Sequence, residues 1–215
     1  MRIPIKYLLV AVTLCALIVG AVFTGRRFLH LGKSVEIVSG KEKGPKDAPI
    51  QMDVYSDFQC PACRNALPMI EEIEQKYSPY VKVIFRQFPL EHNHAWSLLA
   101  AQFSECAAQQ RKFWEFHGRI YATQEEWSKL TDVTPRFIGF AQEIGLDLKV
   151  LEVCLGKEEI ISQIRKERET GAARGVQSTP TIFIGTEVFV GGPQLKERAP
   201  QVIEKELERL GIKIK

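Results

Sequence analysis

Residues 56–66 read SDFQCPACRNA and place two cysteines, Cys60 and Cys63, around a Pro-Ala pair. The residues just before them, 50–55, alternate apolar and polar side chains, which predicts a β-strand. From 60 to 77, a first-turn proline and apolar residues at helical spacing predict a helix. The cysteine pair is therefore expected at the junction where a strand ends and a helix begins.

This junction favours reactive sulfur chemistry. A cysteine at the start of a helix lies among unpaired backbone N–H groups and at the positive end of the helix dipole, and both favour the thiolate over the thiol. Cys63 follows one turn later on the same helix face. We expect an exposed Cys60 of low pKa and a more buried Cys63 that together close a readily attacked disulfide.

Two other roles for the pair are weighed against redox chemistry. Zinc sites usually combine two close pairs of ligands, whereas Cys106 and Cys154 are isolated in the sequence. His92 and His94 belong to a loop and helix start and have no evident third ligand, so no metal site is predicted. A purely structural disulfide between Cys60 and Cys63 would add little to the stability of the fold, because so short a loop removes little entropy from the unfolded chain. Redox chemistry is favoured over both alternatives.

Cys106 and Cys154 are expected to pair with each other. Cys15 lies inside an apolar run and is interpreted as inert, which leaves an even number of cysteines. The close spacing of Cys60 with Cys63 makes theirs the favoured pairing and leaves the other two as partners. Buried free thiols are the alternative, but an oxidising compartment favours a structural disulfide.

The N-terminal residues predict a membrane segment. Residues 7–23 carry no charge and are flanked by basic residues on both sides, so they are just long enough to cross a bilayer as a helix. A cleaved signal peptide is the alternative, with a small-residue site at 19–21. An uncleaved anchor is favoured because the apolar run continues past that site to Arg26 and Arg27. Both interpretations carry the remainder of the chain across a membrane.

Charge argues against nucleic-acid binding. Five of the 29 basic residues lie within 1–33, whereas all 26 acidic residues come later, which leaves 24 basic against 26 acidic residues after position 33. No excess positive charge remains to bind a phosphate backbone.

The order of the predicted elements indicates an α/β fold interrupted by helices. A polar segment at 40–49 reads as a linker before the first strand, and a second strand is predicted at 81–85. From 94 to 154 the apolar residues recur only at helical spacing. Strands return at 181–184 and 188–190 as a hairpin before a last helix, 194–210.

A second motif precedes the returning strand. Residues 178–181 read STPT and contain the Thr179–Pro180 bond. Only about one X-Pro bond in twenty is cis in folded proteins, so the dipeptide alone decides nothing. If the bond is cis, the main chain of Thr179 turns toward the cysteines and can bind an extended substrate peptide by strand addition.

Three stretches together resemble the DsbA-like thiol-disulfide oxidoreductases, which have a thioredoxin fold with an inserted helical subdomain. They are DFQCPAC at 57–63, GVQSTPTIFIG at 175–185, and FPLEHNHAWSLLAAQFSECAAQQRKFWEFHGRIY at 88–121. The resemblance implies that Cys60 is the attacking and attacked sulfur, that Cys63 resolves the intermediate, and that Pro180 is the cis-proline of a substrate groove next to Thr179. It implies no cofactor beyond the redox-active disulfide.

The resulting division of the chain has four parts. A membrane anchor with its flanks occupies 1–33, and a linker follows at 34–49. The thioredoxin-like core comes in two pieces, 50–90 and 173–212, and the helical insertion lies between them at 91–172.

The sequence departs from the family at a position that matters for proton transfer. Many thioredoxin-fold enzymes carry a buried acid six positions before the first cysteine, and here that position is Val54. Asp57 is the candidate to support proton transfer instead, although Asp57 and Asp53 can equally be capping or solvated residues. The Pro-Ala dipeptide differs from the glycine-first pairs of thioredoxin-like reductases and favours oxidation.

We therefore expect a thiol-disulfide oxidase that introduces disulfides into exported proteins. It is expected in the cell (inner) membrane with a single span and its catalytic domain on the periplasmic, extracytoplasmic side. By the resemblance, a quinone-linked membrane thiol oxidase would reoxidise it. A disulfide reductase or isomerase of the same fold is one alternative, and a non-enzymatic chaperone or assembly factor for exported proteins is another.

Overall fold

The computed structural model describes residues 40–213. The predicted membrane segment at 7–23 and Cys15 lie outside these residues. Within 40–213, none of the helices combines the length and the apolar character that crossing a bilayer requires.

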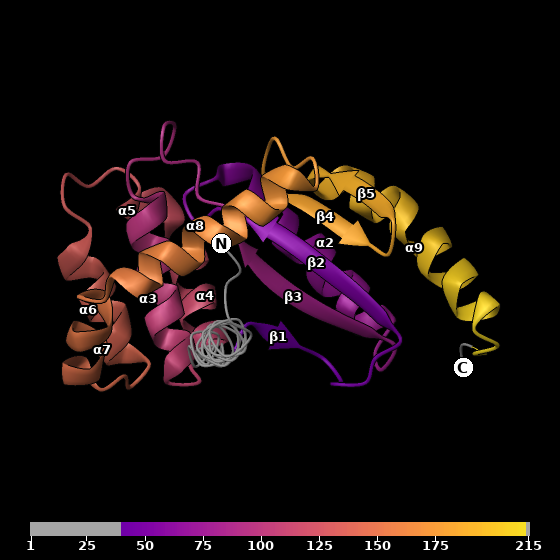
Figure 1. Cartoon of the computed structure of the whole chain (residues 1–215), viewed down its shortest axis with the longest axis horizontal. Coiled ribbons are helices and arrows are strands. Elements are labelled where there is room, and N and C mark those ends of the chain that lie inside the picture. The colour runs from indigo at the N-terminus through magenta and orange to yellow at the C-terminus, as the bar shows by residue number, and fades with distance from the viewer. Residues whose placement is uncertain (1–39, 214–215) are drawn as a thin grey trace, which may run out of the picture. The chain divides into compact units, whose positions relative to one another are not determined.

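A five-stranded sheet forms the centre of the fold, with the order β1-β3-β2-β4-β5 (Figure 1). β2 and β3 are parallel, and every other neighbouring pair is antiparallel. The strands span Glu42–Lys43 (β1), Ile50–Ser56 (β2), Val81–Gln87 (β3), Thr181–Ile184 (β4) and Glu187–Val190 (β5). The predicted strands are confirmed to within two residues at each end.

Part of the predicted linker is instead a sheet edge. β1 pairs with β3, Glu42 opposite Ile84 and Lys43 opposite Val83. Lys41, just before it, is buried and its ammonium group binds a carboxylate oxygen of Glu105 at 2.7 Å. Two residues show no periodicity, so tertiary contacts hold this strand where the local sequence predicts a linker.

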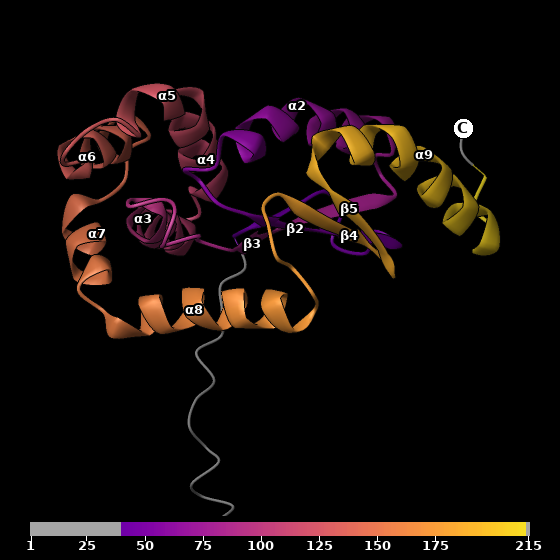
Figure 2. The ribbon, with the colours of Figure 1, turned by 90° about the horizontal axis from the view of Figure 1, so that it is seen from above.

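Helices cover both faces of the sheet. α2 (Pro61–Lys76) and α9 (Gly191–Arg209) pack together on one face, and α8 (Glu158–Ala173) crosses the other (Figure 2). α2 buries residues at helical spacing, namely Cys63, Ala66, Ile70 and Ile73. Because the redox pair opens α2, this packing fixes the pair against the sheet.

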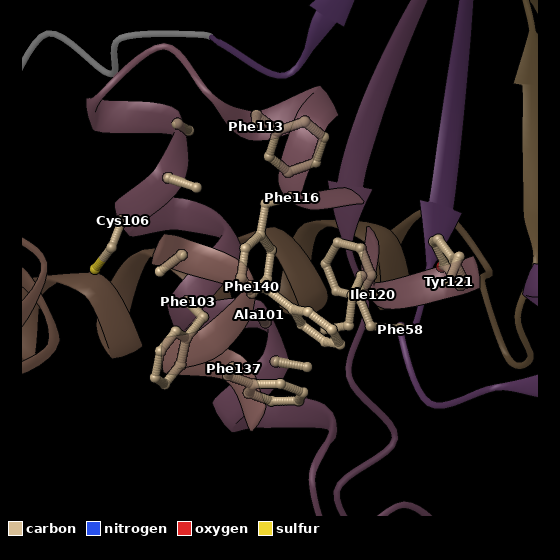
Figure 3. Close-up of a cluster of buried hydrophobic side chains, with 14 of the residues drawn as sticks. Phe58, Ala101, Phe103, Cys106, Phe113, Phe116, Ile120, Tyr121, Phe137 and Phe140 are labelled. Atoms are coloured by element: carbon tan, nitrogen blue, oxygen red, sulfur yellow. The ribbon is translucent and has the colours of Figure 1, made fainter. Parts of the chain in front are cut away.

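The helical insertion gathers at one end of the sheet (Figures 1 and 2). It contains α3 (Ser97–Gln109), α4 (Phe113–Ala122), α5 (Gln124–Trp127), α6 (Thr134–Glu143) and α7 (Leu148–Leu155). Its core is rich in aromatic rings, and this cluster extends to Phe58 (Figure 3). The same cluster includes Cys60 and Cys63. The insertion is thus packed directly against the redox pair. A thioredoxin-like α/β fold with a helical insertion is confirmed.

Candidate active site

Strand register brings the two sequence motifs together. Tyr55, near the end of β2, pairs with Thr181, the first residue of β4. The residues that follow Tyr55 and those that precede Thr181 therefore leave the sheet at the same edge. As a result, the Thr179 carbonyl oxygen lies 3.4 Å from Cys60 Sγ, although 119 residues separate them. The Thr179–Pro180 peptide bond is cis.

Cys60 occupies the N-cap position of α2, and its surroundings favour the thiolate. They lower its pKa to about 5, chiefly through a hydrogen bond from the Cys63 side chain. Burial opposes this effect, while the Thr179 hydroxyl and the backbone N–H groups of Cys63 and Ala62 reinforce it. Thr179 Oγ1 is buried and has no hydrogen-bond partner among the described residues, so it is free to donate to the thiolate.

Cys63 has the opposite character. Its side chain is fully enclosed, and burial together with the neighbouring Cys60 raises its pKa well above the usual value. The backbone N–H of Asp57 donates to Cys63 Sγ at 3.5 Å, which favours the thiolate when it forms. The structure shows both cysteines unbonded. The arrangement therefore holds one sulfur ready to react and keeps the other protonated.

One feature of Cys60 differs from the prediction. An exposed side chain was expected, but only 7% of Cys60 is accessible. The reason is the inserted helical subdomain, because Cys60 and Cys63 lie in the same apolar cluster as Phe58 and the aromatic residues of α4. A substrate sulfur must therefore reach Cys60 through this small accessible area.

The Asp57 carboxylate is buried and binds three partners. Its side chain is 0% exposed, which excludes the predicted alternative of a solvated residue. One oxygen accepts a hydrogen bond from the Gln59 backbone N–H at 2.7 Å, as a capping residue does. The other is 2.8 Å from both the Leu90 backbone N–H and His94 Nδ1. Asp57 thus joins the segment before Cys60 to the loop that carries His94.

Asp53 is not solvated either, but it lies in a separate arrangement. It is buried in β2, and its carboxylate pairs with Arg86 at 2.9 Å and with Arg174 at 3.1 Å. These contacts lie on the face of the sheet that α8 covers. Asp53 therefore has a structural role and does not lie beside the sulfurs of the redox pair.

Several residues that hold the active-site loop were not predicted. Gln124 of α5 donates through Nε2 to the carbonyl oxygens of Phe58 at 2.7 Å and Cys60 at 3.0 Å. The hydroxyl of Tyr121 shares a 2.8 Å hydrogen bond with that of Ser56. These contacts join residues more than 60 positions apart, and no local pattern in the sequence marks them.

Val54, at the position of the missing acid, lines a pocket. Val54 borders a cavity of about 140 Å³ together with Ser56, Phe85 and His117. Burial, with a smaller contribution from Lys43, lowers the pKa of His117 to about 3, so its imidazole is neutral. A histidine of such low basicity is a poor acceptor for the Cys63 proton.

Cys106 and Cys154 are joined by a disulfide, with an S–S distance of 2.01 Å and Cα atoms 5.8 Å apart. The bond links α3 to α7 inside the insertion, and Figure 3 shows Cys106 at the edge of the aromatic cluster. It holds the insertion together.

The histidines and cysteines outside the redox pair were compared with the geometry of a metal site in the part of the chain that the structure describes. Residues 40–213 contain no group of three histidine, cysteine or acidic side chains arranged to hold an ion. His94 of the His-x-His pair binds Asp57 instead.

Comparison with known proteins finds similarity over most of the chain. Residues 37–205 match the family model described as Thioredoxin. The oxidised structure of BdbD from Bacillus subtilis is 26% identical, with a TM-score of 0.69 over 80% of this chain and 95% of that one. Alpha-DsbA1 from Wolbachia pipientis is 23% identical, with a TM-score of 0.67 over 79% and 91%. The catalytic domain of Proteus mirabilis ScsC is 21% identical, with a TM-score of 0.65 over 81% and 92%.

Curated relatives match a shorter part. A Na(+)/H(+) antiporter NhaA 3 from Salinispora tropica is 30% identical over 142 residues, which are 66% of this chain and 21% of that protein. The antiporter NhaA 1 of Mycobacterium sp. (strain KMS) is 32% identical over 146 residues, 66% of this chain and 23% of that protein. The chain thus spans about a fifth of the length of these relatives.

Proposed function

The chain belongs to the thioredoxin family, in its DsbA-like branch of thiol-disulfide oxidoreductases, and from that premise we propose that it oxidises thiols in exported proteins. The observation that carries this proposal is the position of Cys60 at the N-cap of α2, where the Cys63 side chain and the backbone N–H groups lower the pKa of its thiol to about 5. A stable thiolate stabilises the reduced enzyme, and a stable reduced form makes the disulfide form the stronger oxidant.

The reaction proceeds by two thiol-disulfide exchanges. A substrate thiolate attacks Cys60 Sγ of the oxidised pair, forms a mixed disulfide and expels Cys63 as a thiolate. A second substrate thiolate then attacks the substrate sulfur of that mixed disulfide and expels Cys60. Two substrate thiols become one disulfide, the enzyme disulfide becomes a dithiol, and both substrate protons pass to the enzyme sulfurs or to solvent.

The surroundings of each sulfur suit its step. Cys63 leaves as a thiolate that the Asp57 backbone N–H can bind, and its raised pKa then draws a proton. Cys60 leaves as a thiolate that the N–H and hydroxyl donors at the start of α2 stabilise, so it does not need to be protonated as it leaves. An extended substrate peptide would lie along Thr179, whose main chain faces Cys60.

The location and the redox partner are part of the proposal. The uncharged run at 7–23 would anchor the chain in the cell membrane, with the catalytic domain on the extracytoplasmic side. The Cys106–Cys154 disulfide supports an oxidising compartment. Turnover then needs an electron acceptor, for which a quinone-linked membrane thiol oxidase is the candidate by family analogy.

The reduction potential of the Cys60–Cys63 pair tests the direction of electron flow. The protein would be equilibrated with glutathione buffers, and the oxidised fraction measured by alkylation and mass spectrometry. We expect a potential closer to the value of about −120 mV for DsbA than to the value of about −270 mV for thioredoxin. A value near that of thioredoxin would favour the reductase alternative and contradict the oxidase.

A Cys60→Ser variant separates the enzyme from a chaperone. An oxidase loses its ability to oxidise a reduced peptide when this sulfur is removed. A holdase keeps its ability to suppress the aggregation of an unfolded client, because binding does not need the sulfur.

A further inference from the structure

The pocket beside Val54 has apolar and aromatic walls. Its volume is about 140 Å³, and residues of α2, α4, β2 and β3 line it. Val54 of β2 and Phe85 of β3 are buried members of this lining. Leu67 of α2 and Trp114 of α4 are partly buried and also line the pocket. Walls of this kind favour a ligand that contains an aromatic ring.

One buried polar side chain in this lining has no partner. His117 of α4 is 9% exposed and makes no hydrogen bond that the structure records within residues 40–213. Its surroundings explain why. Five aromatic rings pack against the imidazole with centroids 4.9 to 5.9 Å away, namely Phe58, Phe85, Phe113, Trp114 and Tyr121.

The two of these rings that carry polar atoms are bonded elsewhere. Trp114 Nε1 donates to the carbonyl oxygen of Glu42 at 3.1 Å, and the Tyr121 hydroxyl shares a 2.8 Å hydrogen bond with that of Ser56. Neither contact involves His117. A buried polar group without a hydrogen-bond partner is costly, so the ring nitrogens of His117 require a partner that the pocket can supply.

The charges around the pocket favour a neutral ligand. Burial, with a smaller contribution from Lys43, lowers the pKa of His117 to about 3, so its ring offers one N–H donor and one acceptor nitrogen. Lys43 and Glu74 line the pocket as well, but their charged groups pair with each other at 2.9 Å. The remaining charged residue of the lining, Glu71, is exposed and would repel an anion. A cation would lose its hydration among the apolar walls.

The size of the pocket limits the ligand to a single ring. An apolar cavity of about 150 Å³ accommodates benzene. The pocket of about 140 Å³ is close to this size, so it has room for one ring with a small substituent. A hydroxyl group is the substituent that can both donate to and accept from the neutral imidazole.

We propose that this pocket is a binding site for a small neutral phenol, whose ring contacts the apolar walls and whose hydroxyl group forms a hydrogen bond with the His117 ring. The inference goes beyond the proposed function and does not depend on it. Neither Cys60 nor Cys63 lines the pocket, so Cys60→Ser should bind phenol as tightly as the wild type does.

Titration with phenol and with benzene tests the site. Backbone NMR spectra of the ¹⁵N-labelled full chain would be recorded at increasing concentrations of each compound. We expect saturable shifts at Val54 and His117, with a dissociation constant of about 1 mM or below for phenol. Benzene should bind about three- to tenfold more weakly, because it lacks one hydrogen bond. If neither compound gives saturable shifts at these residues, the pocket holds water only and the inference is overturned.

A His117→Phe variant tests the hydrogen bond. The substitution keeps an aromatic ring and removes both ring nitrogens, so phenol should lose its three- to tenfold advantage over benzene. The ratio of the two dissociation constants is compared with that of the wild type. If the variant keeps the full preference for phenol, His117 does not bind the hydroxyl group and the inference is wrong.

Two glycine variants test the position of the ligand. Gly118 of α4 lines the pocket, Gly139 of α6 does not, and a Cβ atom added at either glycine would meet nothing within 4 Å. Gly118→Leu should weaken phenol binding by about tenfold or more, because the leucine side chain occupies the space of the ring. Gly139→Leu is the matched control and should leave binding unchanged. Unchanged binding in Gly118→Leu, or equal losses in both variants, would place phenol elsewhere and contradict the inference.

Discussion

The two cysteine pairs of this chain lie in one continuous apolar cluster but have opposite character. All four cysteines are less than one tenth exposed, so burial alone does not distinguish them. Cys60 stands at the N-terminus of α2, where N–H groups point at its sulfur, whereas Cys154 stands at the C-terminal end of α7, where carbonyl groups end the helix. Chain direction at the helix end thus adds to the stabilisation of the Cys60 thiolate, which comes chiefly from the Cys63 side chain.

The pairs also differ in what surrounds them. Cys60 has donors from Cys63, Thr179 and the backbone. Cys106 lies in the C-terminal half of α3, is 0% exposed, and joins Cys154 across the insertion. An attacking thiolate cannot reach it without unfolding part of the insertion. One fold can thus hold a reactive and an inert cysteine pair in a shared apolar core when the polar groups around the two pairs differ.

The largest expected effect concerns catalysis. Cys60→Ser should reduce the oxidation of a reduced cysteine-containing peptide to the uncatalysed rate, since the attacked sulfur is gone. Cys106→Ser with Cys154→Ser should keep most of the activity under conditions in which the protein stays folded. Stopped-flow measurement of peptide oxidation compares them. If the second variant is as inactive as the first, the separation of roles between the pairs is wrong.

Stability should show the reverse pattern. Replacing Cys106 and Cys154 by alanine removes a bond that closes a 48-residue separation, and should lower the free energy of unfolding by about 4 kcal/mol. Replacing Cys60 and Cys63 by alanine should cost much less relative to the oxidised protein, because their loop is so short. Urea unfolding followed by circular dichroism measures both. Equal losses of unfolding free energy in the two double variants would contradict the distinction between a structural disulfide and a reactive pair.

The Thr179 hydroxyl should account for part of the reactivity of Cys60. Thr179→Val keeps the shape of the side chain but removes a buried donor, so it should raise the pKa of Cys60 by about one unit. Thr186→Val, in the exposed turn between β4 and β5, is the control. Alkylation rates as a function of pH give the midpoint. An unchanged midpoint in Thr179→Val would exclude the hydroxyl as a donor to the thiolate.

A pH dependence of stability should belong to the Cys60–Cys63 pair alone, because disulfide-bonded cysteines do not titrate. The folded-state pKa of Cys60 is lowered from its ordinary value to about 5, so the thiolate stabilises the reduced protein most above the ordinary value. This contribution falls as the pH drops toward 5. The difference in unfolding free energy between reduced wild type and Cys60→Ala should therefore grow from pH 5 to pH 8. A difference independent of pH would contradict it.

The local sequence predicts those features of the fold that depend on the spacing of nearby residues. The junction of β2 and α2 is predicted because alternation changes to helical spacing at Cys60, and the pairing of Tyr55 with Thr181 then brings the distant Thr179 to it. The disulfide partner of Cys106 followed from counting cysteines. These features depend on short periodicities and on the small number of sulfurs.

Contacts between distant parts of the chain could not be predicted from the local sequence. The sequence predicts a loop for His94 and a capping or solvated residue for Asp57, and it does not predict their contact because the hydrogen bond that joins them spans 37 residues. Gln124 reaches the active-site loop from α5 across 64 residues. The burial of Cys60 depends on how the insertion packs, and the edge strand β1 depends on its pairing with β3, neither of which a local pattern contains.

The thiolate titration of Cys60 tests the central claim most directly. The reduced protein would be titrated by its thiolate absorbance at about 240 nm, with Cys60→Ser as the reference from which the Cys60 signal is obtained by difference. The environment of Cys60 predicts a single thiolate with a midpoint at about 5. A midpoint near 8.5, the ordinary value for a cysteine, would show that the start of α2 does not activate this sulfur and would contradict the account.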